Sequence, residues 1–238
     1  MLLLLRGADD MTSYPLYEPM MHHDACGVGF IADRSALASH RIVRLGVDCL
    51  HNLDHRGARS ADGTGDGAGM MTRIPYRLIE RDLVASGKRV PARDRLALVM
   101  AFLPRPGRGA AQGVIEQALA ANGLSVLHWR SVPVDFSVLS KTARRSVPRI
   151  QQAIVVAPDS VADTDEFEKL LLLSRKQMER SEDADTFSIV SCSARTVVYK
   201  GLVTAESIER FYWDLIDPLF ETDFVIFHQR YSTNTDPA

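Results

Sequence analysis

Residues 24–32 have the sequence DACGVGFIA, and this stretch decides how the rest of the chain is interpreted. It places a cysteine, Cys26, at the head of a glycine-rich apolar run that is typical of a buried strand over residues 27–33. Gly27 and Gly29 carry no side chain, so another backbone or a small molecule can approach the chain closely there. We therefore predict a strand that starts directly after a cysteine, and Cys26 is the first candidate for chemistry.

The reactivity of Cys26 depends on whether the peptide bond before it is cleaved. A cysteine attacks as its thiolate, and a free α-amine with a pKa of about 7.7–8.0 can accept the proton of a thiol whose pKa is about 8.5. Residues 1–25 show no periodicity and are interpreted as a leader, and their removal would create that amine on Cys26 itself. Within this leader we expect translation to start at Met11 rather than at Met1.

Three other interpretations of Cys26 stay open at this point. It could be a small buried apolar side chain, a metal ligand together with His22 and His23, or the nucleophile of a papain-like protease. The histidine and cysteine spacing matches no common metal site, and the local signature of papain-like proteases is absent. The other motifs of the sequence have to decide among these interpretations.

The composition is that of an ordinary globular chain. Of the 238 residues, 46% are hydrophobic and 24% are charged, and the net charge of -2 gives no reason to expect nucleic acid or an anionic membrane as a partner. The three cysteines are widely spaced and favour neither a disulfide framework nor a zinc site, so a cytoplasmic location fits best. No stretch approaches the roughly 18 apolar residues of a membrane span, and the apolar run of residues 2–5 is too short for a secretory signal.

The pattern of apolar residues predicts one domain of mixed sheets and packed helices after residue 26. Helices are expected from a cap at Ser39 to about His55, and at 110–121, 165–180 and 205–219. Strands are expected at 27–33, 69–74, 96–103, 124–134, 153–157, 188–192, 196–199 and 224–228. The pair 188–192 and 196–199 is interpreted as a hairpin, and Pro133 indicates an edge position for the strand that contains it.

Five separated blocks, taken in order, resemble the class II glutamine amidotransferases, the N-terminal-nucleophile enzymes that release ammonia from glutamine. The blocks lie at residues 24–32, 53–58, 64–69, 195–201 and 230–235. Within that family the chain looks most like the glutaminase domain of the glutamate synthase large subunit. The resemblance implies an α+β fold, a four-layer αββα sandwich of the N-terminal-nucleophile hydrolase type that is incomplete here. It also implies a leader at 1–25 and an amidotransferase domain at 26–238.

The same resemblance implies roles for the residues that match the family's motifs. Cys26 would be the nucleophile and, through its freed amine, the general base. Arg230 would bind the α-carboxylate of glutamine through a two-pronged guanidinium contact, the alternative being a structural ion pair. The residues expected to support this site are Gly27, His55, Arg56, Gly57, Ser232, Thr233 and Asn234. The glycine loop at 65–69 lacks the spacing of a phosphate-binding loop, and no residue is assigned to a metal.

The family pattern also contains a His-Asn-Gly segment, whose asparagine side chain and glycine N–H form the oxyanion hole. This tripeptide does not occur in the sequence, and the loss of one oxyanion donor typically costs about 10²–10³ in rate. We therefore expect the chain to be an N-terminal fragment that cannot complete catalysis alone. We also expect it to fold less well than a complete domain, because backbone groups of the sheets would be left unpaired.

For the complete enzyme the resemblance implies FMN, an iron–sulfur cluster and NADPH or ferredoxin as reductant, none of them bound by this chain. Its partners would be glutamine, the synthase domains of the same polypeptide and a reductase subunit, and ammonia would pass to 2-oxoglutarate to make glutamate. Two alternatives stay open: the glutaminase domain of another amidotransferase, from purine or asparagine synthesis, and a non-catalytic remnant that docks on a synthase partner.

Overall fold

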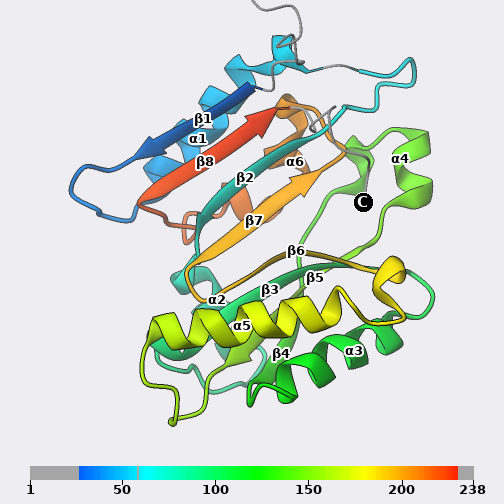
Figure 1. The fold of residues 1–238 in the computed structure, drawn as a ribbon. Coiled ribbons are helices and arrows are strands. Elements are labelled where there is room, and N and C mark those ends of the chain that lie inside the picture. The colour runs from blue at the N-terminus through cyan, green and yellow to red at the C-terminus, as the bar shows by residue number, and fades with distance from the viewer. Residues whose placement is uncertain (1–26, 58, 230–238) are drawn as a thin grey trace, which may run out of the picture. The chain divides into compact units, whose positions relative to one another are not determined.

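The computed structural model describes residues 27–57 and 59–229, which form two four-stranded antiparallel sheets with helices packed on them (Figure 1). The first sheet has the strand order β1-β8-β2-β7, with β1 at Gly27–Ala32, β8 at Phe224–Gln229, β2 at Ala68–Arg73 and β7 at Thr196–Gly201. The second sheet has the order β4-β5-β3-β6, with β4 at Ser125–Ser131, β5 at Arg149–Val156, β3 at Leu96–Leu103 and β6 at Ser188–Ser193.

Helices of very different length connect the strands. The α-helices of the described residues are α1 (His40–Asn52), α2 (Tyr76–Ala85), α3 (Arg108–Ala120), α4 (Lys141–Ser146), α5 (Thr164–Met178) and α6 (Ile208–Phe211). The 3-10 turns are η2 (Asp54–Arg56), η3 (Arg93–Arg95), η4 (Phe136–Val138), η5 (Ala184–Thr186), η6 (Ala205–Ser207) and η7 (Trp213–Ile216). None of the helices in this part of the chain has both the length and the apolar character that crossing a lipid bilayer requires.

Helix α1 covers one face of the first sheet. Its buried residues Val43, Val47 and Leu50 recur at helical spacing, so they lie on one side of the helix. Gly46 lets this side approach β8 closely, because a Cβ at Gly46 would lie only 2.8 Å from Cγ1 of Val225. A larger residue there would push the helix off the sheet.

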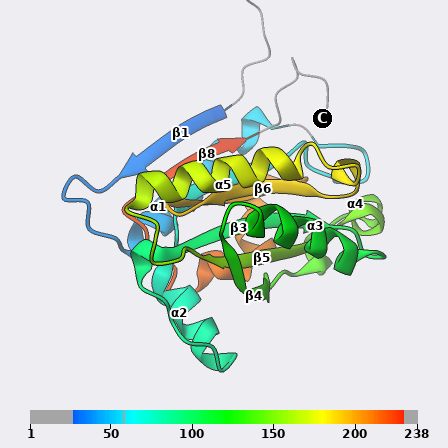
Figure 2. The ribbon, with the colours of Figure 1, turned by 60° about the horizontal axis from the view of Figure 1, so that its bottom comes forward.

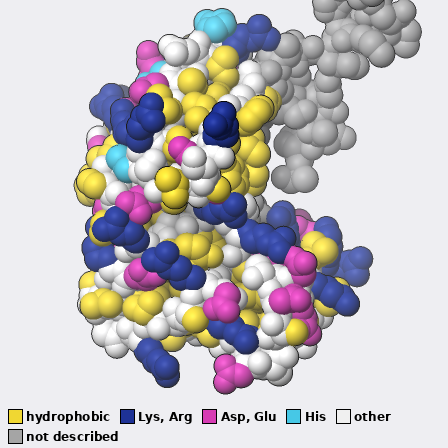
Figure 3. Space-filling model, turned by 90° about the vertical axis from the view of Figure 1, so that its left-hand side faces the viewer, with side chains coloured by type: hydrophobic (Ala, Val, Ile, Leu, Met, Phe, Trp, Pro, Cys, Tyr) yellow, Lys and Arg dark blue, Asp and Glu magenta, His cyan; other side chains and the backbone are white. Residues whose placement is uncertain are grey.

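The other face of the same sheet keeps apolar side chains exposed on β1 and β8. Val28 is 66% exposed, Phe30 is 76% exposed and Ile226, which pairs with Phe30 across the ladder, is 40% exposed. Figure 3 shows hydrophobic side chains gathered on the upper part of the molecule, where the first sheet lies. A strand that alternates between two environments in this way has one face packed in the core and one face open.

The second sheet is covered more completely. Seven of the eight residues of β3 are buried, so both faces of this strand are packed. On one face Ala97, Val99 and Ala101 share a core with Ile115 of α3 and Leu171 of α5, and Figures 1 and 2 show both helices over this sheet. The small side chains of β3 leave room for the two helices to lie close to it.

A buried polar network ties the second sheet to β7. Arg130 of β4 is 5% exposed and donates two hydrogen bonds of 2.7 Å to Asp214 of η7 and one of 2.6 Å to Asp82 of α2. The hydroxyl of Tyr199 on β7 donates to the same Asp214 at 2.8 Å and accepts from Gln152 on β5 at 3.0 Å. Burial alone would lower the pKa of Arg130, but the hydrogen bonds and charge of Asp214 raise it above its usual value.

Several predicted elements are confirmed. The strands predicted at 27–33, 69–74, 96–103 and 224–228 correspond to β1, β2, β3 and β8, and the helices predicted at 110–121 and 165–180 correspond to α3 and α5. The predicted edge strand is β4, which is an edge of its sheet. The helix that starts after Ser39 is α1, although the Ser39 side chain makes no capping hydrogen bond.

The predicted hairpin is wrong, because β6 belongs to the second sheet and β7 to the first. Glu168 of α5 accepts hydrogen bonds from the Ser193 hydroxyl and the Ala194 N–H, at 2.7 and 2.8 Å. The Ser193 hydroxyl in turn accepts from the N–H of Arg195 at 2.9 Å. These contacts hold the connection where the chain leaves one sheet for the other.

Three further expectations are corrected. The strand ladders are all antiparallel, so the sheets are not mixed. The predicted helix at 205–219 is broken into η6, α6 and η7, because Tyr212 has extended backbone angles and its neighbours pair with residues 133–135. Helix α2 was not predicted, although its buried residues Leu78, Ile79 and Leu83 have helical spacing.

Candidate active site

The start of β1 and the end of β8 lie side by side at one end of the first sheet. Gly27 pairs with Gln229 across the ladder, and Gln229 pairs on its other side with Ala68 of β2. Cys26 precedes Gly27 and Arg230 follows Gln229 in the sequence. The two residues predicted to do the chemistry and to bind the substrate are therefore attached to the ends of adjacent strands.

Several predicted site residues lie outside the described residues: Cys26, Arg230, Ser232, Thr233 and Asn234. Their roles stay predictions that rest on the resemblance. Of the remaining predicted residues, the structure brings together three, Gly27, Arg56 and Gly57, around the end of β8. The fourth, His55, is exposed, and its Nδ1 lies 2.9 Å from the carbonyl oxygen of Asn52 at the end of α1.

Two glycines lie where η2 meets the first sheet. A Cβ on Gly27 would lie 3.2 Å from Cδ1 of Leu53 and 3.4 Å from Cβ of Arg56. A Cβ on Gly57 would overlap the side-chain nitrogen of Gln229. The turn therefore packs directly on the strand ends, and the role of this block as scaffold stays a prediction.

The glycine-rich loop before β2 is fixed by its surroundings. A Cβ on Gly65 would lie 2.6 Å from the backbone nitrogen of Thr204 and 2.6 Å from the carbonyl carbon of Val203. Gly67 has a φ of 122°, a backbone conformation that favours glycine. Because the loop is fitted against the segment after β7, its glycines serve close packing.

One row of residues crosses all four strands of the first sheet next to the candidate site. It runs from Lys200 on β7 through Gly69 on β2 and His228 on β8 to Val28 on β1. A Cβ on Gly69 would lie 2.9 Å from Cβ of Lys200 and 3.1 Å from Nδ1 of His228, so glycine is what allows the two basic side chains to flank this position.

The pKa values of the two basic groups of this row are both lowered. Burial lowers the pKa of His228, and the charge of Lys200 lowers it further. Burial also lowers the pKa of Lys200, with a contribution from Arg175 of α5. Sequence reasoning did not assign a role to either residue, although Lys200 lies in a block that carried the resemblance. The position of the two residues in one row could not be read from the sequence.

The remaining cysteines do not offer an alternative nucleophile or metal site. Cys192 makes a 3.6 Å contact from its Sγ to the carbonyl oxygen of Leu171, and burial raises the pKa of its thiol to about 12. Cys49 is partly buried on α1, where it packs against the core. Within residues 27–57 and 59–229, no group of three or more histidine, cysteine or acidic side chains could hold a metal ion.

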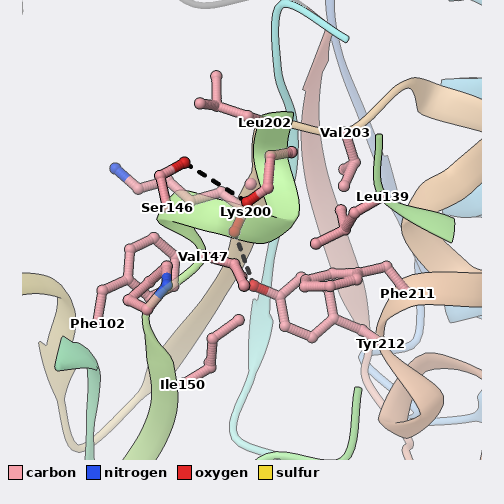
Figure 4. A pocket seen from close by; sticks show the side chains of 13 residues that line it. Phe102, Leu139, Ser146, Val147, Ile150, Lys200, Leu202, Val203, Phe211 and Tyr212 are labelled. Carbon is pink, nitrogen blue, oxygen red and sulfur yellow. Dashed lines mark hydrogen bonds between the residues drawn. The ribbon is translucent and has the colours of Figure 1, made fainter. Parts of the chain in front are cut away.

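An apolar pocket lies between α4, the end of β7 and α6, and it has a volume of about 250 Å³. Figure 4 shows Leu139, Val147, Val203 and Phe211 among the side chains around it. The hydroxyl of Tyr212 donates a 2.7 Å hydrogen bond to the carbonyl of Lys200 in its wall. The lining also includes Ser146 and Lys200, and the Ser146 hydroxyl donates a 3.5 Å hydrogen bond to the carbonyl of Ala143.

Comparison with known proteins identifies the family of this chain. The family model for class II glutamine amidotransferases matches residues 26–238. The chain is 39% identical over 235 residues to the glutamate synthase [NADPH] large chain of Azospirillum brasilense, covering 96% of this chain and 15% of that protein. It is 39% identical to ferredoxin-dependent glutamate synthase 2 of Synechocystis, covering 90% of this chain and 14% of that protein.

A third relative is the glutamate synthase [NADPH] large chain of Bacillus subtilis, 36% identical over 229 residues, with 94% of this chain and 15% of the relative covered. The chain thus spans about one seventh of the length of the curated relatives it matches. The expected α+β fold of the N-terminal-nucleophile hydrolase type is confirmed, and the structure forms it from two antiparallel sheets and packed helices. This chain belongs to the class II glutamine amidotransferase family.

Proposed function

We propose that this chain is the glutaminase region of a glutamate synthase, in which Cys26 becomes the N-terminal residue and attacks glutamine. The observation that carries the proposal is that the family match begins at residue 26, next to the strand end where Gly27 faces Gln229. The ladder attaches Cys26 and Arg230 to neighbouring strand ends, as a nucleophile and a substrate-binding arginine require.

The proposed chemistry needs no metal or cofactor, and its reactants are Cys26, glutamine and water. The Cys26 thiolate forms a bond to the side-chain amide carbon of glutamine, and the carbon–nitrogen bond breaks as the protonated α-amine gives its proton to the departing ammonia. Water then hydrolyses the thioester to glutamate and regenerates the thiol. Arg230 would hold the α-carboxylate of glutamine with two parallel hydrogen bonds, which a lysine cannot supply.

In the complete enzyme the ammonia would be added to 2-oxoglutarate by the synthase region of the same polypeptide, with FMN, an iron–sulfur cluster and a reductase subunit or ferredoxin. The names of the relatives include both NADPH and ferredoxin enzymes. The residues present do not fit an iron–sulfur cluster, because three cysteines are fewer than the four thiolates that usually hold one. No step of the proposed mechanism uses these groups, and the cytoplasm is the proposed location.

The test is the intact mass of the expressed chain after incubation with 6-diazo-5-oxo-norleucine, an electrophile that mimics glutamine. We expect loss of residues 1–25 and one adduct on Cys26. Cys26→Ser is expected to take up no label, whereas the control Cys49→Ser should be labelled like the parent. A mature chain that stays unlabelled at Cys26 would contradict the proposal and favour a non-catalytic remnant that docks on a synthase partner.

A turnover assay sharpens the same test. We expect labelling without measurable ammonia release, because no His-Asn-Gly segment is present to stabilise the oxyanion. Ammonia release from glutamine at a rate that Cys26→Ser abolishes would confirm the glutaminase proposal and refute the expectation that the chain is inactive alone.

A further inference from the structure

The apolar pocket between α4, the end of β7 and α6 has a buried floor and an exposed rim. The side chains of Val147, Ile150 and Phe211 in its lining are buried. At the rim Ser146 is exposed and Leu202 is 53% exposed, so the pocket opens to the surface. A concave apolar wall with a few polar groups is the usual form of a site for a small molecule.

The volume of the pocket limits the size of its ligand. The pocket measures about 250 Å³, whereas an apolar cavity of about 150 Å³ is large enough to bind benzene. One aromatic ring with a short side chain therefore fills the space. A larger ligand would have to extend beyond the rim.

The pocket also has a cation at its side. Among the described residues that line the pocket, Lys200 is the one with a charged side chain. Figure 4 shows this side chain extending past Ser146, so the amino group lies on the same side of the pocket as the Ser146 hydroxyl. Its charged neighbours are the cation Arg175 and the imidazole of His228, and it forms no ion pair with an acidic side chain in the described part of the chain.

These surroundings favour an anion beside Lys200. Burial lowers the pKa of the amino group and the charge of Arg175 lowers it further, and a bound anion would oppose both effects. The Ser146 hydroxyl donates to the carbonyl of Ala143 at 3.5 Å, which is longer than a normal hydrogen bond, so it can turn to a ligand instead. An anionic group at this side of the pocket would thus meet an ammonium and a hydroxyl donor.

We propose that this pocket binds a small aromatic monocarboxylate, with its ring on Val147 and Phe211 and its carboxylate on Lys200 and Ser146. The two oxygens of a carboxylate match the two donors. A phosphate dianion carries more charge than one lysine can neutralise. This inference does not depend on the proposed function, because it uses none of the residues assigned to glutamine.

The experiment titrates the full chain with 3-phenylpropionate, followed by calorimetry and by the NMR signals of the probe. We expect saturable one-to-one binding that weakens as salt is added, because the ion pair lies near the surface. The amide of the same acid has the same shape without the charge. It should bind about tenfold more weakly, because it loses the charge-assisted hydrogen bond.

Two variants assign the binding to the pocket. Lys200→Met keeps the apolar stem without the charge and should weaken the binding of 3-phenylpropionate about tenfold, whereas the control Lys169→Met, on the exposed side of α5, should leave it unchanged. Ala143→Leu adds bulk to the pocket lining and should abolish binding.

Three outcomes would overturn the proposal: no saturable binding, equal binding of the acid and its amide, or unchanged binding by folded Ala143→Leu. Displacement of the probe by glutamine would also overturn it, because the probe would then occupy the proposed glutamine site. Circular dichroism checks folding, and Lys200→Met carries the test if Ala143→Leu is unstable. None of these outcomes affects the labelling of Cys26, so this inference and the proposed function can fail separately.

Discussion

The two sheets of this molecule differ in how completely they are covered. The second sheet has buried residues on both faces of β3 and carries α3 and α5 on one of them. The first sheet is packed by α1 on one face, while Phe30 and Val28 stay exposed on the other. The candidate site lies at the end of the less covered sheet.

The comparison indicates that the second sheet contributes more to stability, whereas the first sheet carries the candidate site. A sheet that buries both faces gains the hydrophobic stabilisation of both, roughly 25 cal/mol for each Å² of apolar surface removed from water. The first sheet buries less apolar surface and is therefore stabilised less. It holds a buried glutamine whose side-chain oxygen has no hydrogen bond within the described part of the chain, and two basic groups with lowered pKa values. Such costs are typical of sites that serve function.

The variant with the largest expected effect, Asp214→Ala, removes a buried contact that links the two sheets. Asp214→Ala leaves the guanidinium of Arg130 buried without its two-pronged partner, and we expect a loss of about 3–5 kcal/mol in the free energy of unfolding. The measurement is urea unfolding followed by circular dichroism. The matched control is Glu80→Ala, which removes an exposed ion pair with Arg93 and should cost at most about 1 kcal/mol. Similar losses for the two variants would contradict the role given to the network.

A second pair of variants tests how well the second sheet is covered. Leu171 of α5 is fully buried, whereas its neighbour Leu172 is 55% exposed. Leu171→Ala should cost about 2–5 kcal/mol, because it leaves a cavity in the core, while Leu172→Ala should stay within about 0.5 kcal/mol. Thermal and urea unfolding of both variants check this, and equal costs would show that the helix does not bury the face assigned to it.

A third variant tests the open face of the first sheet. Phe30→Ser removes the most exposed of the large apolar side chains that the structure describes, and we expect stability to change by no more than about 0.5 kcal/mol. Self-association and binding of an apolar dye should fall, because exposed apolar patches drive both. Analytical ultracentrifugation measures the self-association, and fluorescence measures the dye binding. The control is Leu172→Ser, which replaces an exposed apolar side chain on α5. A large loss of stability would mean that Phe30 is part of the core.

The smallest expected effect concerns how the stability of the chain depends on pH through His228, in the row of residues beside the candidate site. Because the pKa of His228 is lowered in the folded state, the unfolded chain binds this proton more readily. Stability from this group is complete above the ordinary histidine pKa and falls as the pH drops through it towards the lower folded value. His228→Gln should therefore lose less stability on acidification than the parent, as measured by unfolding at a series of pH values. A steeper loss in the variant would reverse the sign assigned to His228.

Much of the site was predictable because it follows from covalent order and local pattern. A cysteine before an apolar glycine-containing run predicted β1, and the terminal apolar run predicted β8. The Gly57 block could be assigned to a turn near the site from the resemblance. What could not be predicted is that Gln229 is buried beneath that turn, because its burial depends on β1 and β2 pairing on either side of β8.

The sequence by itself determined most of the strands and helices, the family, and the cysteine that directly precedes β1. Only the tertiary structure decided which strands share a sheet. The alternation of apolar and polar residues in β6 and β7 would be the same whether the two strands lay in one sheet or in two. The tertiary structure also decided where the helix expected at 205–219 breaks, because the backbone at Tyr212 is extended and its neighbours pair with residues 133–135. Local pattern depends on neighbours a few residues apart, whereas pairing and burial depend on partners that only folding brings together.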